Sequence, residues 1–309
     1  MFQVENLSKR YGELRAVDGI SFQVRAGEVY GLLGPNGAGK TTTLSMLSGV
    51  LKPDNGRILF DDIDLHAEPV KVKQQLGVVP QETALYEDLS ARENLKFWGG
   101  LYGLRGSDLD QAINKTLDRV GLTARAKDAV KNYSGGMKRR LNLALGLIHE
   151  PRLVLLDEPT VGIDPQARVN ILEVVRDVAK SGTTVLYTTH YLEEAESLCD
   201  RIAIMDHGCI LAEGSLDELK KQAGEEETVT IEGNFEAEAV KSKIEEVSSV
   251  RLLSVEQGRA VISTGGSGEG AVKLLERLFG ADLHMHGISI RPPSLNSLFL
   301  NLTGRELRD

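Results

Sequence analysis

Hydrophobic residues along this chain follow two spacings, one typical of strands and one typical of helices. Runs that are alternating or continuously apolar predict strands at residues 2–7, 20–24, 28–34, 57–60, 153–157, 184–189, 201–205 and 209–213. Between several of these strands, apolar residues recur three or four positions apart and predict helices. Strands that alternate with helices predict an α/β fold with a substantially parallel sheet.

The stretch from about 88 to 134 departs from this alternation because its pattern is helical. Ser90 and Glu93 form a capping box, in which each side chain can bond the backbone N–H of the other residue. Apolar residues at helical spacing continue through residues 96–104 and 109–122. We therefore expect a helical insert within the α/β domain.

A boundary near residue 224 separates a large first domain, residues 1–224, from a smaller second domain, residues 225–309. The second domain reads in order as strand, helix, strand, strand, helix and strand, at residues 228–233, 235–247, 250–256, 259–264, 269–279 and 283–290. This βαββαβ order predicts a small α+β domain of the ferredoxin-like kind. A closing helix is expected at 294–304.

Composition narrows the class of protein. The 309 residues are 41% hydrophobic, which is enough for one large core or two moderate ones. A net charge of −9 argues against a nucleic-acid partner, because such proteins carry a basic surface. The sequence offers no apolar run of the ~20 residues that a membrane-spanning helix needs. The N-terminal residues do not resemble a signal peptide, and only two cysteines occur, so we expect a cytosolic setting.

The segment GPNGAGKTT (34–42) fits the phosphate-loop pattern G-x-x-x-x-G-K-[ST]. It follows a predicted strand and opens a predicted helix, so its backbone N–H groups can surround phosphate oxygens at the start of that helix. Lys40 would reach the β- and γ-phosphates, and the Thr41 hydroxyl would ligate Mg²⁺. The alternative, a glycine-rich turn with a surface lysine, does not explain this setting between strand and helix. The sequence thus predicts a nucleotide site.

A second candidate site is RLVLLDEPT (152–160), where a buried strand ends in two acids. Asp157 could hold Mg²⁺ directly or through water, and Glu158 could take a proton from the attacking water. The alternative is an acidic pair that caps a helix. Because a phosphate loop precedes it, we favour a catalytic role for Glu158.

Two further polar residues follow predicted strands. His190 closes TVLYTTH and could contact the γ-phosphate or orient a neighbour, although a lone histidine is more often structural. Gln81 in VVPQE could contact Mg²⁺ or its water, or could be an ordinary turn residue.

Residues 132–147 read NYSGGMKRRLNLALGL and carry no nucleophile, base or metal ligand beside their glycines. Ser134 is expected to cap a helix, and Gly135 and Gly136 let the bare backbone N–H groups approach another molecule closely. A helix N-terminus of this kind is a site for an anion.

Taken in order, GPNGAGKT, VVPQE, YSGGM, LVLLDEP, TVGID (160–164) and TTH resemble the motif set of ABC-transporter ATPase domains over roughly residues 2–223. The segments HYLEEAESLCDRIAIMDHG and PPSLNSLFLNLTGREL further resemble the drug-resistance, daunorubicin-exporter-like ABC-2 group. That resemblance implies a P-loop ABC ATPase fold with a RecA-like core, an antiparallel β subdomain, a helical subdomain and a small C-terminal domain. Two positions depart from the common pattern: Tyr133 stands where leucine is usual, and Met137 where glutamine is usual.

The resemblance also implies residue roles. Tyr11 would stack on adenine, Gln81 would sense Mg²⁺ near a membrane partner, and Asp164 would lie at a dimer interface. The triphosphate and Mg²⁺ would be held by Gly34, Pro35, Asn36, Gly37, Ala38, Gly39, Lys40, Thr41 and Thr42, with Gln81 and Asp157 as further metal contacts. Glu158, His190 and Gln81 would form the catalytic group. Residues Ser134–Gly136 would contact the γ-phosphate of ATP bound to the other subunit.

The function implied is a subunit that binds and hydrolyses ATP, dimerises around two ATP molecules, and powers a separate transmembrane permease, which we expect to be an exporter. The dimer could be a homodimer or a heterodimer, held at the cytoplasmic face of the membrane through the permease. Residues 81–89 and the helical insert are the expected docking region. One alternative is a non-transport ABC ATPase that acts on ribosomes or nucleic acid, although such proteins usually carry two cassettes or a long coiled coil. Another is a monomeric phosphate-loop kinase or GTPase, which leaves residues 132–140 unexplained.

Overall fold

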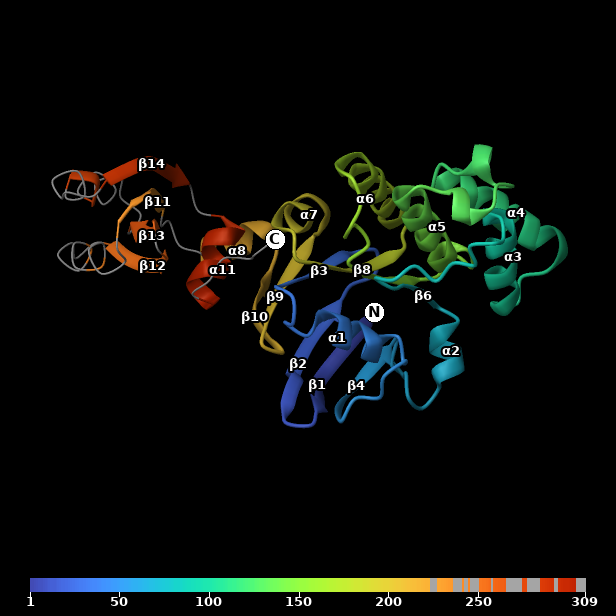
Figure 1. Cartoon of the computed structure of the whole chain (residues 1–309). Coiled ribbons are helices and arrows are strands. Elements are labelled where there is room, and N and C mark those ends of the chain that lie inside the picture. Colours follow the sequence, from blue (N-terminus) through green and yellow to red (C-terminus); the bar gives the residue numbers. More distant parts are fainter. Residues whose placement is uncertain are drawn as a thin grey trace. The chain divides into compact units, whose positions relative to one another are not determined.

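The computed structural model describes residues 1–222, 227–235, 241, 244, 250–256, 258–264, 274–276, 284–291 and 294–303 (Figure 1). The chain divides into two compact units, Met1–Leu211 and Ala212–Asp309. The second unit therefore starts ahead of residue 225, the boundary expected from the sequence. It takes in helix α8 (Leu216–Gln222), because α8 packs against α11 (Leu295–Thr303) of the same unit.

The first unit is built on a six-stranded sheet with the order β10-β9-β3-β8-β7-β6. Its strands are β3 (Val29–Leu33), β6 (Leu76–Val79), β7 (Leu153–Asp157), β8 (Thr184–Thr189), β9 (Arg201–Asp206) and β10 (Cys209–Gly214). The five strands from β9 to β6 pair in parallel, and β3, β7 and β8 are buried along their whole length. Continuous apolar runs are typical of parallel strands covered on both faces, so the predicted α/β class is confirmed.

A smaller antiparallel sheet forms the antiparallel β subdomain, in the order β2-β1-β4-β5. Its strands are β1 (Phe2–Tyr11), β2 (Leu14–Val24), β4 (Asn55–Phe60) and β5 (Ile63–Asp64). Helix α1 (Lys40–Leu47) contacts both β2 and β7. One hydrophobic core joins both sheets to α1, and this core fixes the start of α1 between them. A short helix, α2 (Pro69–Lys73), leads into β6.

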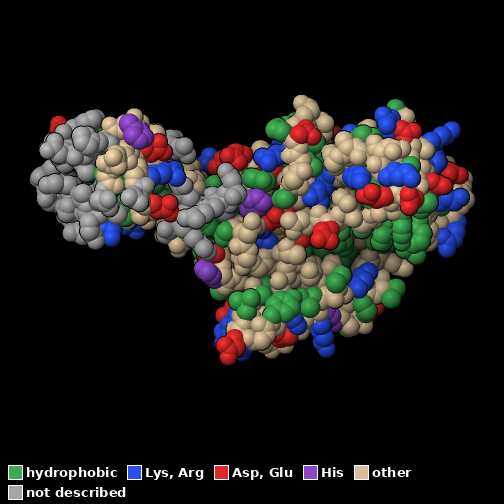
Figure 2. Space-filling view, in the orientation of Figure 1, with side chains coloured by type: hydrophobic (Ala, Val, Ile, Leu, Met, Phe, Trp, Pro, Cys, Tyr) green, Lys and Arg blue, Asp and Glu red, His purple; other side chains and the backbone are tan. Residues whose placement is uncertain are grey.

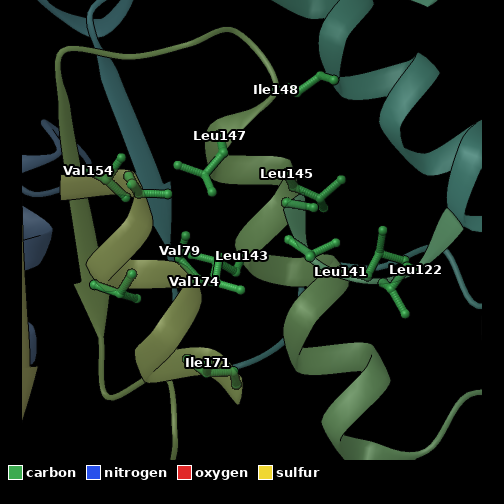
Figure 3. Close-up of a cluster of buried hydrophobic side chains, with 14 of the residues drawn as sticks. Val79, Leu122, Leu141, Leu143, Leu145, Leu147, Ile148, Val154, Ile171 and Val174 are labelled. Carbon is green, nitrogen blue, oxygen red and sulfur yellow. The ribbon is translucent and has the colours of Figure 1, made fainter. Parts of the chain in front are cut away.

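Helices cover the other side of the parallel sheet. They are α3 (Ala91–Leu101), α4 (Gly106–Arg119), α5 (Gly135–Leu147), α6 (Pro165–Lys180) and α7 (Leu192–Leu198). The predicted capping box of Ser90 and Glu93 starts α3. Figure 3 shows why α5 holds the helical region on the sheet: Leu143 points toward Val79 and Val174, whereas Leu141 points toward Leu122. Because one side of α5 packs against β6 and α6 and the other against the helical insert, this helix connects the insert to the core.

The second unit contains an antiparallel sheet in the order β12-β13-β11-β14. Its strands are β11 (Glu227–Asn234), β12 (Val250–Glu256), β13 (Arg259–Thr264) and β14 (His284–Arg291). The first and third predicted strands are thus central and adjacent, which is the pairing that a ferredoxin-like βαββαβ order requires. The helices predicted at 235–247 and 269–279 lie mostly outside the described residues. The predicted closing helix is present as α11.

No helix among the described residues combines the length and apolar character that crossing a membrane requires.

Candidate functional site

The phosphate loop, residues 34–39, connects the end of β3 to the start of α1. Gly37 and Gly39 have φ angles of 82° and 104°, a left-handed region that favours glycine. A Cβ on Gly39 would lie 2.4 Å from the Ala16 carbonyl oxygen, so side chains are excluded there. The loop is therefore pressed against its neighbours on one side, while Asn36 and Gly37 remain exposed on the other.

A cavity of about 520 Å³ opens beside this loop. It is lined by Tyr11, Leu14, Arg15, Ala16, Asn36, Gly37, Gly39, Lys40, Thr41, Thr42, Gln81, Glu158 and His207. Most of the residues predicted to hold a nucleotide thus line one cavity. Tyr11 stands at its edge, half exposed at the end of β1, where an aromatic ring can stack on a base.

Lys40 is the buried cation of the cavity. Its Nζ donates to the carbonyl oxygens of Gly34 and Pro35, at 2.6 and 3.0 Å, and lies 2.9 Å from Glu158 Oε1. Both charged side chains of the Lys40–Glu158 pair are about 95% buried, with exposures of 4% and 5%. Ala38 helps to hold the phosphate loop in shape, because its N–H donates to the Pro35 carbonyl and its side chain is buried.

Asp157 ends β7 beside the start of α1. Its Oδ1 accepts hydrogen bonds from Thr188 Oγ1 at 2.8 Å and from Thr41 Oγ1 at 3.3 Å. Burial raises the pKa of the Asp157 carboxyl above its usual value, and these two hydrogen bonds act in the opposite direction. A hydroxyl beside a carboxylate is an oxygen pair that suits Mg²⁺, which commonly takes one or two carboxylates and completes its shell with phosphates and water. The residues present therefore fit the metal that the fold implies.

Glu158 and His190, predicted from separate motifs, are in contact. His190 Nδ1 lies 3.2 Å from Glu158 Oε2, and both side chains are buried. Glu158 has a φ of 43°, an uncommon conformation for a residue with a side chain, and its N–H donates to Thr188 Oγ1 at 3.0 Å. The Glu158 carboxylate is thus held between Lys40 on one oxygen and His190 on the other.

Gln81 is exposed and lines the cavity, and its backbone is held from α5. Its carbonyl accepts a hydrogen bond from Arg139 Nη1, while Arg139 Nη2 donates to the Val161 carbonyl at 2.9 Å. Asn142 binds the same segment on both sides: its amide donates to the Pro80 carbonyl at 3.1 Å, and its Oδ1 accepts from the backbone N–H three residues beyond Gln81. The backbone on both sides of Gln81 is therefore hydrogen-bonded to α5.

A second cluster of predicted residues lies at the starts of α5 and α6. Ser134 caps α5 and accepts from the Met137 N–H at 3.3 Å, and Asp164 caps α6 and accepts from the Ala167 N–H at 2.9 Å. Gly136 is buried so closely that a Cβ there would lie 2.6 Å from Ala167 Cβ. Ser134 and Gly135, by contrast, are exposed.

This second cluster is separate from the cavity. The described residues that line the cavity beside the phosphate loop do not include Ser134, Gly135, Gly136 or Asp164. The structure thus brings the phosphate loop, Glu158, His190 and Gln81 together, and it leaves the Ser-Gly-Gly segment apart from them.

Residues 17–161 match the family described as ABC transporter, and residues 214–303 match the family described as ATP-binding protein DrrA1-3-like, C-terminal domain. The linearmycin resistance ATP-binding protein LnrL of Bacillus subtilis (strain 168) is 44% identical over 311 residues, with 100% of both chains covered. The chain belongs to the ABC transporter ATP-binding family. It is similar to the drug-resistance group of that family, as the sequence predicted.

Other relatives of this ABC ATPase support the same membership. The daunorubicin resistance ATP-binding protein DrrA3 of Streptomyces coeruleorubidus is 38% identical over 312 residues, covering 99% of this chain and 96% of the relative. A solved dimeric ATP-binding cassette bound to ADP and Pi aligns with a TM-score of 0.64 and 25% identity, covering 70% of this chain and 99% of that chain. The chain is thus an ATP-binding and ATP-hydrolysing subunit of the ABC type, and the kinase, GTPase and non-transport alternatives are disfavoured.

The structure accounts for the two departures from the common ABC motif. Tyr133 is buried, and its hydroxyl donates to the Arg125 carbonyl at 2.7 Å, a bond that leucine could not make. Met137 packs against the hydrophobic core of the helical region.

Sequence reasoning missed several residues of the site. Arg15 and His207 line the cavity of this ABC ATPase, and Thr188 holds the Asp157–Glu158 pair. Only Thr188 had a sequence signal, since it lies two positions before His190 on the same strand. Arg15 lies near the start of β2 and His207 in the turn between β9 and β10, and these two segments meet only in the folded chain.

Proposed function

We propose that two copies of this chain enclose two ATP molecules, and that the dimer drives export through a separate transmembrane permease. The observation that carries the proposal is the division of the site. One chain supplies the phosphate loop, Lys40 and Glu158 in one cavity, while Ser134 and Gly135 stand exposed outside it. An exposed helix start with bare N–H groups attracts an anion, and a second chain's ATP supplies one.

In this proposal Lys40 and the backbone N–H groups of residues 34–42 hold the phosphates, and Tyr11 stacks on the base. Thr41, Asp157 and Gln81 hold Mg²⁺, which when bound neutralises phosphate charge and polarises the γ-phosphate. The residues of this chain then orient the attacking water. Glu158 takes its proton, and His190 holds the Glu158 carboxylate in place.

The Lys40–Glu158 ion pair gives the site two arrangements. With the phosphates bound, Lys40 turns from Glu158 Oε1 to phosphate oxygens, because several negative charges there outweigh one carboxylate. Glu158 is then freed on one oxygen and still held by His190 on the other. Nucleotide binding in this way converts an ion-paired carboxylate into an available base.

The permease is proposed to dock on residues 81–89 and α3. Two aromatic side chains there are exposed, Tyr86 at 47% and Phe97 at 44%, and their rings meet edge to face at 5.0 Å. Leu89 and Leu101 are exposed nearby in sequence, and Figure 2 shows hydrophobic side chains on the surface of the helical region. Exposed aromatic residues that adjoin one another are typical of a protein interface. Through this surface the chain would lie at the cytoplasmic face of the membrane.

Export, rather than import, is proposed from the named relatives, which are resistance proteins. In the same proposal, the first unit is the ATP-binding domain and the second unit is an accessory domain.

The test of the divided site is Gly135→Asp. A side chain on Gly135 meets nothing within 4 Å, and an acid in the first turn of a helix is favourable, so the variant is expected to fold. We expect ATP binding by the isolated chain to be unchanged and ATP hydrolysis to be lost, because the new carboxylate repels the γ-phosphate of the other chain.

Fluorescent-nucleotide titration and phosphate release measure the two quantities. Gly135→Ala is the matched control, since it adds a Cβ without charge and should retain more hydrolysis than the acidic variant. Ser134 is a poorer target, because replacing this cap costs about 1 kcal/mol of stability. Normal hydrolysis by Gly135→Asp would show that the segment has no role in the site.

A further inference from the structure

A buried carboxylate lies behind the catalytic pair and belongs to none of the predicted motif roles. Glu194, on α7, is 2% exposed. Its Oε1 accepts from Thr160 Oγ1 at 2.7 Å, and its Oε2 accepts from Tyr187 OH and Thr189 Oγ1, both at 2.8 Å. Burying a carboxylate is costly unless its oxygens are hydrogen-bonded, and three hydroxyl donors meet that requirement here.

These donors come from the two segments that carry the catalytic residues. Thr160 lies two positions after Glu158, and Thr189 lies directly before His190. One carboxylate therefore joins the strand end of Glu158 to the strand end of His190. Tyr187 supports the same group from within β8, and burial raises the pKa of its phenol well above the usual value, so the phenol stays a donor.

The same carboxylate also reaches α6. Arg168 Nε lies 3.5 Å from Glu194 Oε1, and its guanidinium sits 4.2 Å above the Tyr191 ring. The Tyr191 ring in turn lies 4.2 Å from the His190 ring, centroid to centroid. Arg168 is one helical turn after Asp164, and its N–H donates to the Asp164 carbonyl at 3.0 Å. The contacts thus run from the start of α6, at the second cluster, to His190, which contacts Glu158 at the cavity.

We propose that Glu194 is a positioning residue for ATP hydrolysis: it fixes His190 against Glu158 and links both to the start of α6. This inference rests on the catalytic roles proposed above for Glu158 and His190. Glu194 acts through its neighbours, and it does not itself face the cavity. Its carboxylate sets the separation of two strand ends, because the three hydroxyls that it accepts from are themselves fixed on rigid strands and on the segment after Glu158.

The variant Glu194→Gln keeps the shape of the side chain, but only one of its two terminal atoms can still accept hydrogen bonds from the three hydroxyls. An amide has one acceptor oxygen and one NH₂ donor. Its NH₂ group therefore faces at least one hydroxyl that donates to the carboxylate in the wild type, and two donors cannot bond to each other. The hydroxyls must turn or separate, and the His190–Glu158 contact of 3.2 Å shifts with them. Misplacement of a catalytic group by about 1 Å costs on the order of 100-fold in rate.

We expect Glu194→Gln in the full-length chain to lower the kcat of ATP hydrolysis by roughly 10- to 100-fold, with the KM and the nucleotide Kd unchanged. Glu193→Gln, the exposed neighbour on the same helix, is the matched control and should keep the wild-type kcat. Thr160→Val, which removes one donor, should lower kcat as well, and Thr160→Ser, which keeps the hydroxyl, should restore it. If Glu194→Gln does not fold, the Thr160 pair decides the question.

A double-mutant cycle with His190→Ala separates positioning from loss of stability. If Glu194 acts through His190, Glu194→Gln lowers kcat in the wild-type background and changes it less than about 2-fold in the His190→Ala background. Equal effects in both backgrounds, or wild-type kcat in both Glu194→Gln and Thr160→Val, would overturn the proposal. Normal hydrolysis by His190→Ala and Glu158→Gln alone would instead overturn the catalytic roles on which it rests.

Discussion

At the scale of single residues, the backbone of Glu158 connects the fold to the chemistry. A φ of 43° is costly for a residue with a side chain, and such conformations cluster at functional sites. Thr188 compensates, since its hydroxyl accepts the Glu158 N–H and donates to Asp157. The turn places two adjacent acids differently, with Asp157 beside Thr41 and Glu158 between Lys40 and His190.

This geometry predicts the behaviour of Glu158→Gln. The amide keeps the size of the side chain and cannot take a proton from water, so hydrolysis should fall by about 10²–10⁴-fold. ATP binding should persist, because the phosphate loop is unchanged. Phosphate release under saturating ATP, beside a nucleotide titration, checks both statements, and near-normal turnover would exclude Glu158 as the base.

The site residues that could be predicted were those carried by local motifs. Lys40, Asp157 and Glu158 follow from a loop or strand read along the chain. The Lys40–Glu158 ion pair and the Glu194 network could not be predicted, because they join residues distant in sequence through side chains whose partners only the fold brings near. Buried polar contacts of this kind have no sequence period.

At the scale of elements, a half-buried histidine connects the end of α5 to the sheet. His149 follows α5, its ring stacks on Tyr102 at 3.5 Å, and its Nε2 lies 3.0 Å from the Leu76 carbonyl in β6. Burial lowers the pKa of His149 from 6.5 to about 4, although the bond to Leu76 acts in the opposite direction. The imidazole therefore stays neutral in the folded chain across a range where it is charged when unfolded.

The sign of the resulting pH dependence follows by linkage. Between pH 6.5 and 4 the unfolded chain binds the extra proton, so the free energy of unfolding falls as the pH is lowered through this window. His149→Phe keeps the stacked ring and removes the proton site. At pH 7.5 the variant should be about 1 kcal/mol less stable than the wild type, because it lacks the hydrogen bond to Leu76. On going from pH 7.5 to pH 5.0, the free energy of unfolding, measured with urea, should fall less for the variant than for the wild type. An equal loss in both proteins would contradict the account.

Element types were predictable where the hydrophobic period was long or the cap was explicit, as for α3 behind Ser90. The extent of the second unit was not, because α8 belongs with α11 through contacts between segments that are far apart in sequence. A local change of composition near residue 224 marks the end of α8 rather than the division of the chain.

At the scale of the whole molecule, the fold separates the two helix starts that we propose bind phosphate. The start of α1 lies in the cavity with the phosphate loop, and the start of α5 is exposed beyond it. Buried packing of α5 against the sheet keeps that second start on the helical region (Figure 3). A site that needs the start of α1 and the start of α5 together is completed only when a second copy supplies one of them. An isologous dimer completes two such sites at once.

Mixing two inactive variants tests this claim most directly. Gly135→Asp disables only the exposed helix start, and Glu158→Gln disables only the base. In a mixed dimer, the base of the Gly135→Asp chain faces the intact Gly135 of the other chain, so one complete site forms. The account predicts that the mixture hydrolyses ATP well above the sum of the two variants assayed alone. A mixture that is no more active than that sum would contradict a site shared between two chains.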